Sequence, residues 1–263
     1  MEQNNEILTT HDKGIISVNN FLSQQQCSVI INSANKKGWN NSSPSGGGHG
    51  RTGNEDARTN SFCVLFDEKL AEDIWNGIKK ILPDDLEFLG QNAYFNSVTQ
   101  GKEWKPAFIY DKMRIYKYDP NEVFPEHIDY KVKRNLKVKG KEYVQQSFLS
   151  ILVYLNEDFT GGETGYWPDH NGIHCRFLRN VEKQSCKKDH QVIITPEIGK
   201  LVIQDQNILH EGLPTSKGTK YLLRTDIIHQ REVIRPDSIK SNESDFKGEW
   251  ERLFETSCKN YAD

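Results

Sequence analysis

Three side chains of the sequence, His127, Asp129 and His210, could together hold a metal ion. His127 and Asp129 are two residues apart, so on an extended strand both side chains leave from the same face. His210 follows 83 residues after His127, on another apolar run. Two imidazoles and one carboxylate on one side of an Fe(II) ion leave the opposite positions open for a bidentate ligand and for dioxygen. The spacing therefore predicts an iron site, although a single histidine is more often a core residue than a ligand.

Two cations follow the second histidine on one predicted strand. Lys220 lies ten residues after His210, and Lys220, Leu222 and Arg224 alternate with their neighbours, so the two cations share a face. Because an unpaired charge inside a β-core is costly, inward-facing cations require an anion, which a dicarboxylate cosubstrate would supply. Arg224 could share that carboxylate, replace Lys220 as its main anchor, or face a buried acid instead.

The elements that must position these residues form a series of short strands between about Met113 and Ile228. Gly, Pro, Asn or Asp separates the strands, and no helical segment lies between them. This pattern is typical of an antiparallel sandwich or barrel, and we expect a mainly β fold with a double-stranded β-helix (jelly-roll) core. The predicted strands are Met113–Tyr118, His127–Lys131, Ser147–Leu155, Gly162–Trp167, His190–Thr195, Lys200–Gln204, Ile208–Gly212 and Lys220–His229.

Two helices are expected to support this core. Ser23 is a suitable N-cap for a helix through about Asn35, which Gly38 ends. Asp67 caps a second helix through about Ile81. The other expected elements are a frayed N-terminus at residues 1–13, strands at Ile15–Val18 and Phe62–Phe66, and a short closing helix at Phe246–Cys258.

Two further segments leave alternatives open. The Asn-, Ser- and Gly-rich stretch at residues 40–48 is either a plain linker or a lid over the site. The charged insertion at residues 169–188 is either a plain polar loop or part of a zinc site, although its spacing matches no standard zinc template. Its potential ligands, with the histidine that follows, are His170, His174, Cys175, Cys186 and His190.

Composition limits the classes of protein that the chain could belong to. The 263 residues carry 34 basic and 37 acidic side chains and a formal charge of −3, which argues against a general nucleic-acid or membrane-surface binder. Five scattered cysteines indicate a reducing compartment, and the sequence shows no signal peptide or long apolar run, so we expect a cytoplasmic or nuclear protein. One domain should span residues 1–263, with support in 1–112, the β-core in 113–230 and an extension in 231–263.

These motifs resemble the 2-oxoglutarate- and Fe(II)-dependent oxygenases, most closely their prolyl 4-hydroxylase-like branch. The shared pattern is a Tyr-containing strand, a turn, an aromatic residue and His-x-Asp, and later a His with a basic residue about ten positions on. One departure is the turn at residues 119–122, which reads Asp-Pro-Asn-Glu where many relatives carry glycine, yet Asn tolerates positive φ. The matching elements are Met113–Asp129, Tyr154–Asn156, Gly161–Thr164, His210 and Lys220.

The resemblance implies a role for individual residues. The iron ligands would be His127, Asp129 and His210. The residues around 2-oxoglutarate would be Lys220 at its far carboxylate, Tyr118, Tyr154 and, with the alternatives given above, Arg224. Dioxygen would be the second cosubstrate and ascorbate a reductant. For substrate contacts we select Arg58, Asn60, Tyr130, Tyr166 and Trp167, with ordinary β-core packing as the alternative for the aromatic residues.

The activity that the resemblance implies is hydroxylation of an unactivated C–H bond, coupled to decarboxylation of 2-oxoglutarate to succinate. The first substrate hypothesis is a prolyl residue in a peptide or protein, and the second is a free amino acid or another small molecule. A third hypothesis is a catalytically silent β-helix protein that binds a metal or a partner, with His127 and His210 as structural residues.

Overall fold

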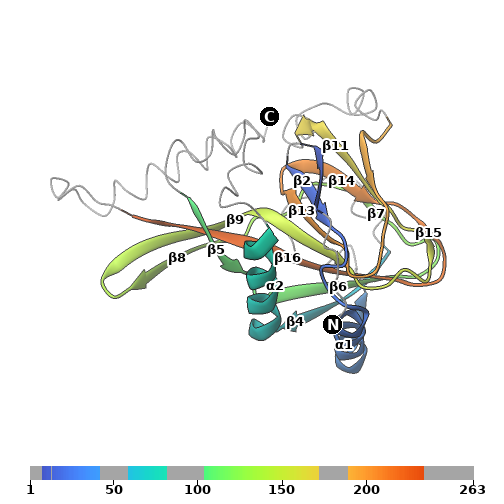
Figure 1. Ribbon diagram of the computed structural model, residues 1–263, viewed down its shortest axis with the longest axis horizontal. Helices are drawn as coiled ribbons and strands as arrows, with labels where there is room; N and C mark the ends of the chain where they lie inside the picture. Colours follow the sequence, from blue (N-terminus) through green and yellow to red (C-terminus); the bar gives the residue numbers. More distant parts are fainter. Residues whose placement is uncertain (1–7, 13, 42–58, 82–103, 172–188, 234–263) are drawn as a thin grey trace.

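Two antiparallel β-sheets dominate the computed structural model, which describes residues 8–12, 14–41, 59–81, 104–171 and 189–233 (Figure 1). The strands are β1 (Leu8–Asp12), β2 (Ile15–Val18), β3 (Asn40–Asn41), β4 (Ser61–Phe66), β5 (Lys105–Ile109), β6 (Lys112–Tyr118), β7 (Phe124–His127), β8 (Lys133–Val138), β9 (Lys141–Tyr154), β10 (Thr160–Gly161), β11 (Thr164–Asn171), β12 (Val192–Ile194), β13 (Leu201–Asp205), β14 (Ile208–Gly212), β15 (Thr215–Lys217) and β16 (Lys220–Glu232). The large sheet runs β1-β2-β13-β9-β16-β6-β4-β3, with β5 on β16 and β8 on β9. The small sheet runs β12-β11-β14-β7, and β10 pairs with β15.

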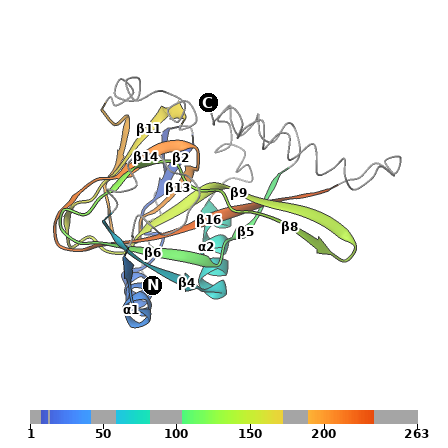
Figure 2. The same ribbon diagram turned by 180° about the vertical axis from the view of Figure 1, so that it is seen from behind.

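The inner faces of the two sheets share one apolar cluster. Tyr116, Leu152 and Val202 reach it from the large sheet, and Tyr166 and Ile208 reach it from the small sheet. Two antiparallel sheets that enclose a common core form the expected jelly roll, so the predicted fold class is confirmed. Figure 2 shows the small sheet, marked by β11 and β14, over one end of the large sheet. The long strands β9 and β16 of the large sheet continue from there toward its other end.

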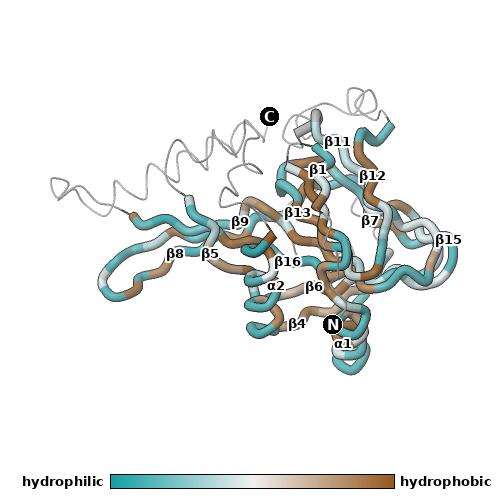
Figure 3. The backbone as a smooth tube through the Cα atoms, in the orientation of Figure 1, coloured by the Kyte–Doolittle hydropathy of each residue, from teal (hydrophilic) through white to brown (hydrophobic). Residues whose placement is uncertain are grey.

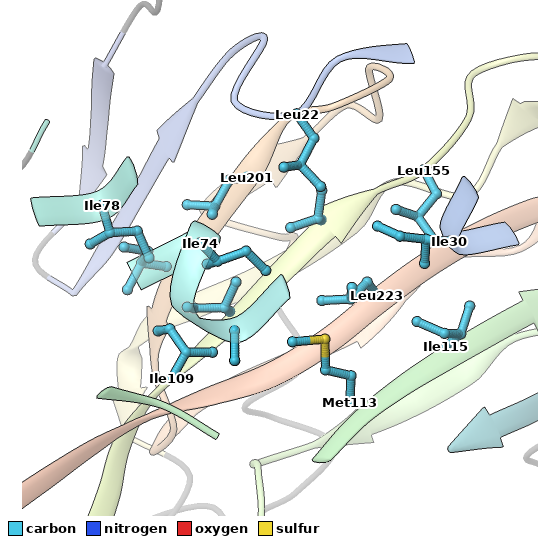
Figure 4. Packing of buried hydrophobic residues seen from close by; sticks show 14 of the residues in the cluster. Leu22, Ile30, Ile74, Ile78, Ile109, Met113, Ile115, Leu155, Leu201 and Leu223 are labelled. Atoms are coloured by element: carbon cyan, nitrogen blue, oxygen red, sulfur yellow. The ribbon is translucent and has the colours of Figure 1, made fainter. Parts of the chain in front are cut away.

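The outer face of the large sheet carries the two helices, α1 (Gln24–Lys37) and α2 (Glu68–Ile81). Successive residues of a strand point to opposite faces, so β9 sends Ile151 and Val153 to the helix side and Leu152 to the inner side. Figure 4 shows Ile74 and Ile78 of α2 in this outer cluster. The tube in Figure 3 is brown along the central strands and teal along the helices' outer sides. Neither helix is long and apolar enough to cross a membrane.

The predicted helix ends are confirmed. The Ser23 side chain accepts a hydrogen bond from the backbone N–H of Gln26, whose own side chain returns to Ser23 in a capping box. Gly38 follows α1 with φ of 96°, a conformation that a residue with a Cβ rarely adopts. Asp67 accepts a hydrogen bond from the Leu70 backbone N–H at 2.8 Å at the start of α2.

Three features differ from the expectation. Residues 8–12 are not frayed but form β1, because they pair with β2 through backbone hydrogen bonds. The polar side chains of this segment gave no sign of that pairing. The strand that carries His127 covers Phe124–His127 rather than 127–131, so Asp129 lies beyond its end. β8 pairs with β9 in a hairpin that a lysine-rich sequence does not predict.

Residues 42–48, Arg58 and the expected helix at 246–258 lie outside the described residues.

Protonation of His229 is expected to contribute to acid unfolding. Burial lowers the pKa of His229 to about 4, against the weaker opposite effect of the Ile227 carbonyl, whereas an unfolded histidine titrates near 6.5. The folded state is therefore favoured in full above pH 6.5 and loses about 3 kcal/mol as the pH falls to 4. In urea unfolding at pH 7 and pH 4, His229→Phe should retain about that much more stability on acidification than the parent. Equal acid sensitivity of both proteins would contradict this role.

Candidate metal centre

The structure brings together the three side chains that the sequence singled out as metal ligands. His127 and His210 are directly opposed in the register of β7 and β14. Asp129 lies just beyond β7, where its backbone N–H donates to the Gln206 carbonyl at 3.0 Å. One ligand atom from each of the three side chains lies within 4.8 Å of the others. Such spacing allows all three to bind one ion.

Backbone carbonyls fix the tautomer of both imidazoles. Nδ1 of His127 lies 2.8 Å from the Pro125 carbonyl, and Nδ1 of His210 lies 2.9 Å from the Ile208 carbonyl. A carbonyl oxygen can only accept, so each Nδ1 donates and each Nε2 keeps its lone pair. The two Nε2 atoms lie 3.9 and 3.8 Å from the carboxylate oxygens of Asp129. This donor set fits a divalent metal of the Fe(II) type.

The carboxylate of Asp129 is paired with a buried guanidinium. Arg224 Nη2 lies 3.2 Å from Asp129 Oδ1 and 3.0 Å from Asp226 Oδ1, and it donates to Ser150 Oγ at 3.1 Å. Burial alone would raise the pKa of Asp129, but the positive charge of Arg224, together with the two histidines, holds this pKa well below its usual range. Asp129 therefore stays ionised and oriented.

A buried amide joins the same group. Gln204 Nε2 lies 3.1 Å from Asp129 Oδ2 and 3.0 Å from His210 Nε2, and its Oε1 accepts a hydrogen bond from the Tyr166 hydroxyl. The Tyr166 ring also stacks on the His210 ring, with centroids 5.7 Å apart. These contacts limit the rotation of His210 and Asp129 around the position of an ion.

Lys220 is the first residue of β16, the strand that also carries Arg224, and its side chain is fully buried. Its Nζ donates to the Gly162 carbonyl at 2.6 Å and lies 5.0 and 5.4 Å from the ring centroids of Tyr118 and Tyr154. Among the residues that the structure describes, Lys220 forms no salt bridge. Burial lowers its pKa to about 7, because the charged form loses its hydration, and the negative charge of Glu163 opposes this shift only in part.

A second buried polar group lies beside this lysine. Thr215 Oγ1 has no hydrogen-bond partner among the described residues. A Cβ placed on Gly162 would lie 3.0 Å from Lys220 Cδ and 3.2 Å from Thr215 Oγ1, so glycine at this position lets both side chains pack closely against the backbone. An ammonium and an unsatisfied hydroxyl beside the same glycine fit a carboxylate, which accepts hydrogen bonds from both.

The residues selected as substrate contacts occupy different places. Tyr130 follows Asp129 and is 73% exposed, whereas Asn60 is fully buried and donates to the Ser61 carbonyl at 3.3 Å. Tyr166 is inside the barrel beside His210. Trp167 points to the opposite face of β11 and contacts the His190 ring, with centroids 4.3 Å apart.

Only part of the alternative zinc site is described. His190 lies 2.8 Å from Glu211 Oε1, and the segment with His174, Cys175 and Cys186 lies outside the described residues. Within the described part of the chain, the group with metal-ligand geometry is the one formed by His127, Asp129 and His210.

Four residues of the site were not found from the sequence: Ser150, Gln204, Thr215 and Asp226. A signal existed for two of them. Gln204 shares the inner face of β13 with Val202, and Asp226 follows Arg224 by two residues on β16, so each is a polar residue on an inner face of an apolar strand.

A match to a protein-family model agrees with this geometry. Residues 113–225 match the family model described as the 2OG-Fe(II) oxygenase superfamily. No curated protein sequence is significantly similar to the chain. One similar solved structure is the 2OG complex of the viral collagen prolyl hydroxylase vCPH from Paramecium Bursaria Chlorella virus-1, with 20% identity over 82% of this chain and 96% of that chain, and a TM-score of 0.44.

Two further solved structures show comparable similarity. A Pseudomonas putida prolyl-4-hydroxylase is 16% identical over 82% of this chain and 92% of that chain, with a TM-score of 0.46. A prolyl hydroxylase from Trichoplax adhaerens, in complex with a hypoxia inducible factor peptide fragment, is 16% identical over 82% and 83%, with a TM-score of 0.45. The substrates in these descriptions are those of the three proteins themselves.

Proposed function

We propose that this chain, whose residues 113–225 match the family model of the 2OG-Fe(II) oxygenase superfamily, is an oxygenase of that superfamily and hydroxylates a prolyl residue in a peptide or protein. The observation that carries the proposal is the convergence of His127, Asp129 and His210 within 4.8 Å. The prolyl substrate class rests on the resemblance of the sequence to the prolyl 4-hydroxylase-like branch. An approach for a polypeptide is supported by the exposed ring of Tyr130, next to a proposed ligand.

His127, Asp129 and His210 would hold Fe(II), and Lys220 with Thr215 would hold the far carboxylate of 2-oxoglutarate. When bound, this pair supplies the oxidising power that places one oxygen atom of O2 in a substrate C–H bond and the other in succinate, with release of CO2. The chain orients the ligands: carbonyls fix both imidazoles, and Arg224 keeps Asp129 charged. The fully buried rings of Tyr154 and Tyr166 would keep water away from this side of the site.

The proposed function is tested with the full chain, Fe(II), 2-oxoglutarate, O2 and ascorbate to keep the iron reduced. Proline-containing peptides should gain 16 Da at proline, with succinate formed in equal amount. His210→Ala should reduce both products to background, because it removes one of three ligands. Succinate formation that is stimulated by a metabolite and by no peptide would assign a small-molecule substrate instead. Equal succinate from parent and His210→Ala would contradict the oxygenase site.

Removing the unsatisfied hydroxyl of Thr215 should weaken the binding of 2-oxoglutarate. Thr215→Val keeps the shape of the side chain, and the KM for 2-oxoglutarate should rise about five- to tenfold, the equivalent of one hydrogen bond of about 1 kcal/mol. Ser216→Ala, at the exposed neighbouring position, should leave this KM unchanged. If Thr215 had only a packing role, Thr215→Val would raise stability and leave the KM as it is.

A further inference from the structure

A strongly basic hairpin extends from the barrel close to the candidate metal centre. Residues 131–142 contain six basic side chains and one acidic side chain, a net charge of +5 in a chain of formal charge −3, so the rest of the chain carries −8. We call β8, the turn at 139–140 and the first residues of β9 the basic arm. Figures 1 and 2 show the basic arm projecting away from the rest of the large sheet.

The arm is an ordered hairpin rather than a loose loop. β8 and β9 pair in register from Lys133↔Gln146 to Val138↔Lys141. The two turn residues, Lys139 and Gly140, have φ values of 49° and 81°, which is the geometry of a tight two-residue hairpin turn. Within the described residues, β8 pairs with β9 alone, and no described strand pairs with its other edge, which we call its open edge. Five of its six residues are exposed.

Lys133 of the arm and Arg231 of β16 lie on one face of the large sheet. The register places Lys133 opposite Gln146, which is opposite His229, and Arg231 is two residues further along β16 on the same face. Although Lys133 is largely exposed, partial desolvation of its ammonium lowers its pKa, and the charge of Arg231 lowers it further. Arg231 also lies 5.1 Å from the ring centroid of Trp104. An anion over this face would stabilise both cations.

The arm leads directly from the candidate metal centre. Lys131 is two residues after Asp129, and the exposed ring of Tyr130 lies between them. The connection is held in place, because the Val132 N–H donates to Ser147 Oγ at 2.8 Å and the Ser147 N–H donates to the Val132 carbonyl at 2.9 Å. From residue 129 to the turn at 139, an extended chain spans about 33 Å. A polypeptide that passes the metal centre could therefore continue along the arm.

Lysines on an edge strand also protect a sheet from aggregation. Protection alone requires one or two charges that point outward, whereas residues 131–142 carry six basic side chains against one acidic side chain. A nucleic acid is a weaker candidate partner than an acidic peptide. A duplex carries one charge per 1.7 Å or so and would extend beyond the arm onto a body of net charge −8.

We infer that the basic arm binds an acidic segment of the polypeptide substrate, within about ten residues of the residue that is hydroxylated. The inference rests on the proposed function and adds a sequence requirement to it. Backbone pairing along the open edge of β8 and charge pairing with the arm's lysines would both favour an extended acidic chain. The arm thus provides substrate selection outside the site of chemistry.

Binding is tested under anaerobic conditions with the full chain, Fe(II) and 2-oxoglutarate, so that no turnover is needed. The probes are two dye-labelled peptides of about 20 residues, one with a central proline flanked by glutamates and one with glutamines in their place. Fluorescence anisotropy at 50 mM salt should show about tenfold tighter binding of the acidic peptide, with the difference lost at high salt. Equal binding of both peptides would overturn the inference.

The variant Lys137→Glu/Lys139→Glu reverses two exposed charges of the arm that take no part in the metal centre. It should weaken binding of the acidic peptide about tenfold and leave the glutamine peptide unaffected. The control Lys36→Glu/Lys80→Glu makes the same charge change at exposed positions of α1 and α2 and should alter binding less than twofold. Unchanged binding in the arm variant, or tighter arm-dependent binding of a 20-nucleotide duplex or single strand, would overturn the inference.

Substrate-independent succinate formation separates this inference from the proposed function. The arm variant should retain the parent rate of that reaction, because the metal centre is intact. If parent and variant both formed no succinate with any substrate while the acidic peptide still required the arm, the proposed function would fail and acidic-peptide binding would stand. If succinate formed normally and the arm variant bound the acidic peptide as the parent does, the arm inference alone would fail.

Discussion

Replacing Arg224 by methionine is expected to lower the free energy of unfolding by about 3–5 kcal/mol and to weaken metal binding at least tenfold. Arg224 is the cation between the carboxylates of Asp129 and Asp226, at 3.2 and 3.0 Å. Without it, two buried carboxylates repel each other, and the pKa of Asp226, which burial already raises, rises further. Urea unfolding at pH 7 measures the first effect. Titration of the full chain with Mn(II), without substrate, measures the second.

A second substitution separates the two effects. In Arg224→Met/Asp226→Asn, one of the repelling charges is gone, so most of the lost stability should return, while Asp129 still lacks the guanidinium that orients it. Metal affinity should therefore remain low in the double variant. Arg224→Lys keeps the charge and should fall between parent and Arg224→Met in both measurements. If Arg224→Met kept the stability and the Mn(II) affinity of the parent, the ion pair between Arg224 and Asp129 would have no role in orienting the Asp129 carboxylate.

The same substitution decides between the roles that the sequence left open for Arg224. Strand alternation placed Lys220 and Arg224 on one face but could not identify the partner of either, since a partner depends on which strand lies opposite. In the fold, Arg224 faces Asp129 and Asp226, and Lys220 faces Gly162 and two tyrosines. On this geometry, Arg224→Lys should leave the KM for 2-oxoglutarate within about twofold of the parent.

Local signals in the sequence were sufficient to predict many of the helices and strands that position the site. The caps at Ser23 and Gly38 predicted α1, and the alternation of apolar residues predicted most strands of the jelly roll. Such signals depend on residues close in sequence, as do the spacings from His127 to Asp129 and from His210 to Lys220. The structure then placed these spacings around one centre through the pairing of β7 with β14.

Tertiary pairing determined the rest, and the sequence carried little trace of it. Gln204 and Thr215 belong to the candidate site because of what lies across the barrel, not because of their neighbours in sequence. No strand was predicted for the basic arm, because its lysines hide the alternation that identifies a strand. Its pairing with β9 becomes visible only in the fold. Sequence reasoning thus lacked the burial of a polar side chain at Gln204 and Thr215, and the strand pairing at the basic arm.

Replacing Lys220 by methionine should raise the KM for 2-oxoglutarate about 100- to 1,000-fold, the effect of removing one partner of a buried charge pair worth about 3–4 kcal/mol. Lys220 is fully buried, and methionine has a similar length, so the fold should be retained or become more stable. The control is Lys217→Met, three residues earlier at an exposed position of β15, which should leave the KM unchanged. A change of less than threefold in Lys220→Met would exclude Lys220 as the anchor.

The pH dependence of this KM gives an independent measurement of the same contact. Because burial lowers the pKa of Lys220 to about 7, the protein without cosubstrate loses the ammonium as the pH rises above 7, whereas only the charged form pairs with a carboxylate. Binding of 2-oxoglutarate then requires proton uptake, and its KM should rise about tenfold for each pH unit between 7.5 and 9. Lys220→Arg keeps its charge across this range, so its KM should be nearly constant. A parallel rise of the KM in parent and Lys220→Arg would place the titrating group elsewhere.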